Sequence, residues 1–451
     1  MKIYIPSNLE LEKFLQKNDL KNRDKYYYII HKIYEEKIFD KSYNKDSYVS
    51  LNAKVLESII VRYKPILDTL IKYEVIEQDN WYIVGAKSKG FRLTEKYRNN
   101  KHKAIELTNQ KILYRICRYK QKMIDNIPEG VEYSLLYENL QKITIDSTNA
   151  INFTYSNYSN DEYAKIYNLI SIEKLRSKDF FFKVDNTAGR VHTNITNLDS
   201  NLRPSLRFDD KKFINIDISN SQPFLFNLLI KEYFNETNIF IKPIYINFIL
   251  SYSSFSFYNY LLFIYNNINI NSINNINNNK YYIYNYLFTI YNLSYVRKYY
   301  DVMLYEKLTC EGKFYEYLMD KFEVKAQERR KFKRDVFKRI FFSRIPKKRE
   351  YVYWKKFKKL FPTVSSIILF YKQTDYKNLA VQLQKSEADI MINKIVKRIA
   401  IEKPECFILT IHDSILTTKD NKEYINKVIL EEFGNSFNLK PSLKTEILYS
   451  L

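Results

Sequence analysis

The sequence predicts an α+β protein in which strands form antiparallel hairpins and helices occupy separate blocks. Residues 51–93 follow the order helix, turn, helix, hairpin, and residues 106–185 are polar and mostly helical in pattern. Residues 406–418, CFILTIHDSILTT, read as an apolar strand, a His-Asp turn and a second strand. These three stretches carry the prediction of fold class.

The charge of the chain indicates a polyanionic partner. The 451 residues have a formal net charge of +22, and their number allows two or three domains of about 100 to 200 residues each. A basic excess of this size favours nucleic acid over an anionic membrane. Cys117, Cys310 and Cys406 lie far apart without metal-binding spacing, so we expect neither disulfides nor zinc. No signal-peptide pattern opens the chain, and the expected location is the reducing cytoplasm.

One uncharged segment raises the alternative of a membrane span. Residues 243–279 contain no charged side chain and are rich in Ile, Tyr and Phe, but Ser and Asn interrupt them throughout. We therefore expect no membrane partner. The wider stretch of about 232–308 is interpreted as a low-complexity insertion, to which no function is assigned.

The order of elements in residues 51–93 resembles a winged helix. The stretch LNAKVLESIIV predicts one helix, KPILDTLIKYEVI predicts a second with Pro65 near its first turn, and WYIVGAKSKGFRL alternates about a turn at AKSKG. In such a module the second helix enters a major groove while the wing contacts phosphate, here through Lys87, Lys89 and Arg92. A winged helix that docks onto protein is the alternative.

Two strand-end carboxylates point to catalysis. In FINIDIS (213–219), Ile214, Ile216 and Ile218 face one side of a strand, so Asp217 faces the other side near the end of the strand, before a helix expected to open at Pro223. Asp413 follows the strand at 406–411. Either acid alone is most simply a capping or turn aspartate. Together in a basic chain they suggest a site for two Mg²⁺ ions that transfers phosphoryl groups, in which Mn²⁺ can substitute.

A basic helix at 327–344 supplies a candidate cradle for a triphosphate. Arg330, Arg334, Lys338 and Phe342 recur every four residues as one stripe, with the cations placed for phosphates and the aromatic ring for a base. The opposite, core-facing side is expected to carry Phe332, Val336, Phe337 and Ile340. An ordinary solvated basic face is the alternative.

With these residues identified, the chain resembles the palm and fingers of family A DNA polymerases, the bacterial DNA polymerase I type, over roughly residues 186–420. Asp217-Ile218-Ser219-Asn220-Ser221-Gln222 is similar to the family's Asp-Tyr-Ser-Gln-x-Glu motif, and Ile411-His412-Asp413-Ser414 to its Val-His-Asp-Glu motif. Arg334, Lys338 and Phe342 match its Arg-x3-Lys-x3-Phe motif. Residues 189–207 and 383–391 resemble two further family segments in the correct order.

The resemblance implies a role for each matching residue. Asp217 and Asp413 would bind the metal ions, with Lys338 completing the catalytic set and Arg334 and Lys338 holding the incoming triphosphate. Phe342 would contact the nucleobase, and Gln222 falls where the family has a Glu that excludes a ribose 2′-hydroxyl. The residues expected to touch the primer-template near the growing end are Arg190, Gln384 and His412.

The sequence also departs from the family pattern. Gln222 keeps the size of the family Glu but loses its charge, which puts sugar selection in doubt. Pro346 replaces the fingers tyrosine, Ser343 a fingers glycine and Lys385 the glycine after the palm Gln. No exonuclease motif precedes residue 186, so we expect no proofreading.

The resulting domain prediction is a winged-helix-like nucleic-acid-binding domain at 1–105, a helical thumb-like region at 106–185 and a right-hand polymerase palm with helical fingers at 186–451. The expected activity is that of a template-directed DNA polymerase (a nucleotidyltransferase) acting on a DNA primer-template and nucleoside triphosphates, in replication of a phage, plasmid or other mobile element. Three alternatives stay open: a single-subunit RNA polymerase-like enzyme with RNA as product or template, a template-independent nucleotidyltransferase, and a non-catalytic winged-helix replication factor.

Overall fold

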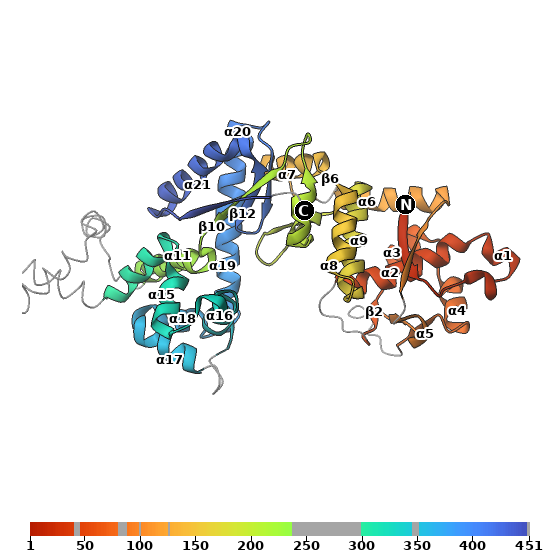
Figure 1. Ribbon diagram of the computed structural model, residues 1–451, viewed down its shortest axis with the longest axis horizontal. Helices are drawn as coiled ribbons and strands as arrows, with labels where there is room; N and C mark the ends of the chain where they lie inside the picture. The colour runs from red at the N-terminus through yellow and green to blue at the C-terminus, as the bar shows by residue number, and fades with distance from the viewer. Residues whose placement is uncertain are drawn as a thin grey trace, which may run out of the picture.

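The computed structural model describes residues 1–39, 46–79, 88–98, 101–124, 127–236, 299–344 and 351–448. It is a helix-rich α+β fold with small antiparallel sheets, which confirms the predicted class. The molecule is elongated, with the N-terminal elements at one end and the helices around residues 314–371 near the other (Figure 1). Most of the stretch interpreted as an insertion, residues 237–298, lies outside the described residues. Within the described ranges, no helix is both long and apolar enough to cross a bilayer.

The N-terminal unit is built around one helix that is buried on several sides. This helix, α2 (Arg23–Phe39), carries Tyr28, Ile29, Ile30 and Ile33 into the core. Such wide burial is typical of a central helix rather than a surface helix. The other elements of the unit are β1 (Lys2–Pro6), η1 (Leu11–Lys13), α1 (Lys17–Leu20), β2 (Val49–Ser50), α3 (Ala53–Ile59), α4 (Lys64–Lys72), β3 (Ile76–Gln78), β4 (Gly90–Leu93), α5 (Glu95–Arg98), β5 (His102–Glu106) and α6 (Gln110–Ile124).

Both predicted helices are present in this unit, but the second ends at Lys72, and Ile76, placed at the end of that helix by the prediction, lies in strand β3 instead. Asn52 caps α3 by accepting hydrogen bonds from the backbone N–H groups of Lys54 and Val55, and Pro65 occupies the first turn of α4, where no N–H donor is needed. Strand β4 pairs antiparallel with both β3 and β2. The first strand of the predicted hairpin and part of its turn, residues 80–87, lie outside the described residues.

The middle of the chain divides its apolar side chains between two cores. Helix α9 (Glu162–Arg176) contributes Ile166 and Leu169 to the N-terminal core, but Ile172 and Leu175 to the C-terminal core. This helix therefore joins the two halves. The remaining elements here are α7 (Val131–Lys142), β6 (Thr144–Ile145), α8 (Ser147–Asn157), β7 (Phe182–Val184), β8 (Val191–Thr193), α10 (Asn194–Asn197), η2 (Ser200–Ser205) and β9 (Leu206–Arg207).

A four-stranded antiparallel sheet lies at the centre of the C-terminal half. Its strand order is β11-β12-β10-β13, formed by β10 (Phe213–Ile218), β11 (Ile408–Ile411), β12 (Ser414–Thr418) and β13 (Leu443–Ile447). Strands β10 and β12 are nearly 200 residues apart in sequence, yet they lie side by side (Figure 1). Along β10 the isoleucines are buried while Asn215 and Asp217 are only half-buried, as the alternation predicted.

Helices surround this sheet and extend away from it. They are α11 (Ser221–Glu236), α15 (Phe314–Phe322), η4 (Ala326–Glu328), α16 (Arg329–Val336), η5 (Phe337–Phe342), α17 (Tyr351–Leu360), α18 (Pro362–Tyr371), α19 (Asn378–Ala388), η6 (Asp389–Val396), α20 (Lys397–Glu402), η7 (Lys419–Asn421) and α21 (Lys422–Phe437). Residues 299–310 are also helical. The segments η5 and η6 are π-helical, a form that often occurs at functional sites. Helix α11 begins at Ser221, two residues before the predicted start at Pro223.

Candidate active site

The two predicted carboxylates meet at one end of the central sheet. In the pairing of β10 with β12, Asp217 lies opposite Ser414, the residue after Asp413. Because Ile411 pairs with Ser414, His412 and Asp413 form a two-residue turn, in which His412 has φ 56°. Histidine is among the residues that tolerate this left-handed conformation. The register therefore brings Asp217 and Asp413 together from distant parts of the chain.

Electrostatics show that these carboxylates interact. Burial raises the pKa of Asp217 to about 6, and the negative charge of Asp413 adds to this increase. Lys333 on α16 and Lys444 on β13 oppose the increase, and Lys444 lies directly opposite Asp217 in the sheet. A partly buried Asp217 carboxylate beside a second negative charge favours a cation between the two groups.

The donor chemistry of this pair fits a hard divalent ion. Carboxylate oxygens are the ligands that Mg²⁺ prefers, and it often uses only one or two of them together with water and substrate phosphates. Among the described residues, no group of three or more His, Cys, Asp or Glu side chains forms a cage for a metal ion. The pair Asp217 and Asp413 thus suits an ion that completes its coordination with substrate.

A buried polar cluster lies beside the carboxylates. Glu387, at the end of α19, is only 2% exposed and pairs with Arg190 at 2.6 Å. The side-chain amide of Gln222 on α11 donates a hydrogen bond to the same carboxyl oxygen. Burial raises the pKa of Glu387 to about 7, outweighing the attraction of Arg190, and the charge of Asp413 acts in the same direction. The structure therefore brings together two predicted site residues, Arg190 and Gln222, through a third that sequence reasoning missed.

Three buried atoms of this cluster carry unused hydrogen-bonding capacity. They are Arg190 Nε, Gln222 Oε1 and Glu387 Oε1, which have no hydrogen-bond partner among the described residues. Buried polar atoms are normally paired, so their convergence at one point is a sign of a ligand-binding position. In the sequence, Glu387 lies three residues after the predicted Gln384. That spacing alone does not distinguish it from an acid on the protein surface.

The loop that presents Arg190 is held by one aspartate. Asp185 accepts hydrogen bonds from the backbone N–H groups of Thr187, Ala188 and Arg190, and Gly189 adopts φ 77°, a conformation that favours glycine. The hairpin of β7 and β8 also brings His192 within 6.1 Å of His412, measured between ring centres. Burial lowers the pKa of His412, with Arg190 acting in the same direction.

The basic helix departs from the predicted stripe at its C-terminal end. Arg334 and Lys338 are exposed, and neither has a hydrogen bond or ion pair among the described residues. From Phe337 onward the helix is of the π type, so positions four apart no longer share a face. Phe342 is half-buried with its ring 4.3 Å from that of Phe337, measured between centroids. The prediction that Phe337 and Phe342 lie on opposite sides was therefore wrong.

The remaining predicted contacts have separate surroundings. Gln384 is half-buried on α19, three residues from Glu387. In the N-terminal unit, Arg92 pairs with Glu77 at 2.8 Å and its guanidinium stacks over Tyr48, so this side chain is engaged within the protein. Lys89 is exposed, and Lys87 lies outside the described residues, as does Pro346.

Comparisons with known proteins give little further guidance. No family model matches the chain, and no curated protein matches it by sequence. Among solved structures it is similar to the "POL domain of Pol1 from M. smegmatis complex with DNA primer-template and dNTP", with a TM-score of 0.34 and 11% identity over 66% of this chain. The matched region spans 55% of that chain. A likeness of this size does not establish a shared fold.

Proposed function

We propose that the protein is a nucleotidyltransferase that extends a nucleic-acid 3′-hydroxyl, and specifically a template-directed DNA polymerase with a family A-like palm. The observation that carries the proposal is the juxtaposition of Asp217 and Asp413 across the paired strands β10 and β12. If Asp217 and Asp413 served only as helix-capping and turn residues, neither would need a second carboxylate that repels it. The net charge of +22 supports nucleic acid as the partner.

In this proposal the two carboxylates hold Mg²⁺. When bound, the metal would supply Lewis-acid stabilisation of the negative charge on the phosphoryl oxygens. Asp217 and Asp413 would act by holding the metal's positive charge at this end of the sheet. The exposed cations Arg334 and Lys338, which are unpaired among the described residues, bind the triphosphate of the incoming nucleotide. Lys333 brings the same helix within electrostatic reach of Asp217. Phe342 contacts the base only if the π-helical segment rearranges or the base approaches beside Phe337.

The cluster of Arg190, Gln222 and Glu387 is proposed to contact the primer end and the sugar. Gln222 occupies the position where the family resemblance implies a glutamate. Its hydrogen bond to Glu387 on α19 places a carboxyl group next to this position. The unused acceptors Gln222 Oε1 and Glu387 Oε1 can each receive a hydrogen bond from a sugar hydroxyl. This feature keeps a ribonucleotide-incorporating enzyme as the second candidate.

The N-terminal helix–helix–hairpin unit is proposed to bind duplex as a winged helix. Lys89 on the hairpin is exposed. Arg92 would have to release Glu77 before contacting phosphate. The domain limits 1–105, 106–185 and 186–451, and a role in replicating a mobile element, belong to the same proposal.

Incorporation of labelled nucleotides tests the proposal directly. The purified chain is supplied with a primer, with or without template, in Mg²⁺ or Mn²⁺, and with either deoxyribo- or ribonucleotides. Template-dependent extension with deoxyribonucleotides supports the first candidate, and preferential use of ribonucleotides supports the second. Absence of extension under all conditions, with duplex binding intact, would reject both in favour of a binding protein.

A further inference from the structure

A cavity outside the candidate active site lies where the N-terminal unit meets α9 and β7. Its volume is about 710 Å³, within the range of about 300 to 1,000 Å³ that is usual for ligand pockets. Helices α2, α6 and α9 and the segment 179–186 contribute to its lining. Since β7 pairs with β8, this wall belongs to the hairpin that presents Arg190 at the candidate active site.

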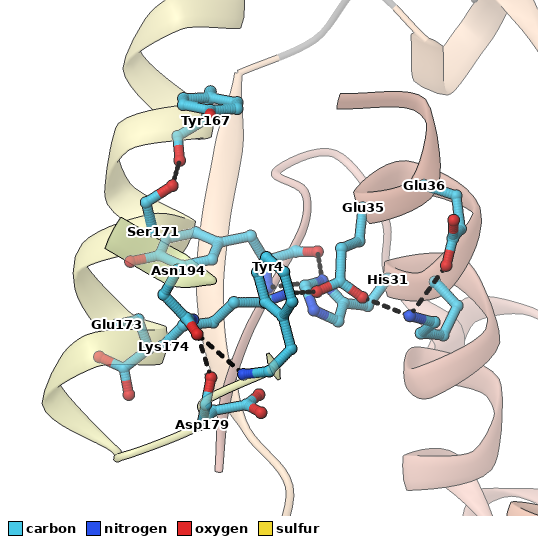
Figure 2. Close-up of polar contacts among 12 residues, drawn as sticks. Tyr4, His31, Glu35, Glu36, Tyr167, Ser171, Glu173, Lys174, Asp179 and Asn194 are labelled. Carbon is cyan, nitrogen blue, oxygen red and sulfur yellow. Dashed lines mark hydrogen bonds and ion pairs between the residues drawn. The ribbon is translucent and has the colours of Figure 1, made fainter. Parts of the chain in front are cut away.

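The inner part of the cavity is a network of paired charges. Lys174 reaches from α9 to Glu35 on α2, as Figure 2 shows, and Lys32 binds Glu35 at 2.6 Å from within α2. These two ammonium groups hold the pKa of the buried Glu35 well below its ordinary value despite the opposing effect of burial. Next to them, His31 contacts the backbone of Tyr4, and burial lowers its pKa to about 4, so it is neutral at physiological pH.

The lining as a whole is cationic. Four lysines, Lys32, Lys120, Lys174 and Lys183, face two carboxylates, Glu35 and Asp179, which leaves a surplus of two positive charges. Lys120 pairs with Asp179 at 2.5 Å. Lys183, by contrast, is exposed and has no hydrogen bond or ion pair among the described residues. An anion entering the cavity therefore meets a free ammonium group at Lys183.

Aromatic rings line another part of the wall, beside aliphatic side chains such as Ile59 and Ile116. Tyr28 and Tyr119 come from the helices, and Phe180, Phe181 and Phe182 come from the segment that leads into β7. Phe181 is 38% exposed, so its ring is accessible to a ligand. In proteins that bind single strands, bases stack on exposed aromatic rings of this kind.

We propose that this cavity binds a nucleotide, with the base against the aromatic wall and the phosphate at Lys183. A purely apolar ligand would leave the Lys183 ammonium group without an anionic partner, and inorganic phosphate alone would leave the aromatic side chains uncovered. A nucleotide satisfies both halves of the lining. Its source is either a free nucleotide or an unstacked nucleotide of a single strand that continues along the β7–β8 hairpin.

Binding measured by calorimetry tests this inference without reference to turnover. Adenosine monophosphate is titrated into the full chain in the presence of EDTA, with adenosine and inorganic phosphate as separate probes. Lys183→Glu and Phe181→Ala should each weaken binding of the monophosphate at least tenfold, since both remove an exposed contact. Lys111→Glu and Tyr114→Ala are matched controls on the exposed surface of α6 and should leave binding unchanged.

The two sources of the nucleotide are separated by competition. Displacement of adenosine monophosphate by an oligonucleotide of ten deoxyadenylates indicates a strand, and failure to displace it indicates a free nucleotide; both support the pocket.

A double Arg334→Ala, Lys338→Ala variant guards against binding at the candidate active site. Affinity that persists in Lys183→Glu but disappears in the double variant would overturn the inference, as would no detectable binding to the wild-type chain. EDTA removes the divalent ions that the proposed polymerase activity needs, so this experiment measures binding alone. The polymerase activity is tested separately by the incorporation assay.

Discussion

Asp217 lies opposite Ser414 in the antiparallel pairing of β10 with β12, one residue from Asp413. This relationship depends on the two-residue turn at His412 and Asp413, which places Asp413 directly before the residue that pairs with Asp217. A one-residue slip of β10 would instead turn Asp217 toward the core face. The position of the site is therefore set by strand register.

The carboxylate pair gives the first prediction. Asp217→Asn or Asp413→Asn should lower nucleotide incorporation by about a thousandfold, equivalent to about 4 kcal/mol of lost transition-state stabilisation. Thermal stability at pH 7 should stay equal or rise, because each substitution removes repulsion between partly desolvated acids. Primer extension and thermal melting measure the two effects. Asp209→Asn, in an exposed turn before β10, is the control. Full activity in either site variant would refute the assignment.

The exposed cations Arg334 and Lys338 on the basic helix give the second prediction. Arg334→Ala or Lys338→Ala should raise KM for the nucleotide about ten- to a hundredfold, since a charge-assisted hydrogen bond contributes about 1.5 to 3 kcal/mol. Affinity for the primer-template should change little. Lys331→Ala, on an exposed position of the same helix, provides the comparison. Identical KM values in all three variants would remove this helix from the nucleotide site.

Glu387 gives a third prediction, concerning pH. The folded protein holds the Glu387 proton up to about pH 7, whereas the unfolded chain releases it near 4.5. Stability should therefore fall by about 3 kcal/mol from this group as pH rises through that interval. Urea unfolding of Glu387→Gln should show less decline with pH than wild type. The exposed Glu423→Gln should follow wild type, and parallel curves for all three proteins would contradict the prediction.

His31 is expected to act in the opposite direction. Its pKa is about 4 in the folded protein against 6.5 for the free side chain, so only the unfolded chain takes up a proton there between these values. The stability contributed by the neutral ring is present above pH 6.5 and is lost as pH falls, by about 3 kcal/mol in total. The stability of the His31→Leu variant should decrease less than that of the wild type as pH falls. Unfolding monitored by circular dichroism at several pH values measures this difference. An unchanged acid dependence would show that the ring does not stay neutral when buried.

Local patterns in the chain predicted several elements correctly. Alternation predicted β10, Pro65 marked the first turn of α4, and the His-Asp pair marked the turn between β11 and β12. These features depend on the periodicity of apolar side chains and on backbone preferences, both of which are determined by a few neighbouring residues. The prediction that Phe342 continues the stripe was wrong. It assumed α-helical spacing, and residue spacing gives no signal of the change from α to π winding at η5.

By itself, the sequence determined which side chains could carry chemistry: two strand-end acids, a row of cations and a basic surplus. Only the tertiary structure decided which of them meet. It paired Asp217 with the Asp413 turn, joined Arg190 and Gln222 through Glu387, and opened a lysine- and aromatic-lined cavity between the N-terminal unit and β7. Such contacts depend on the register and packing of segments hundreds of residues apart, and burial then sets the charge of each group, which no local pattern specifies.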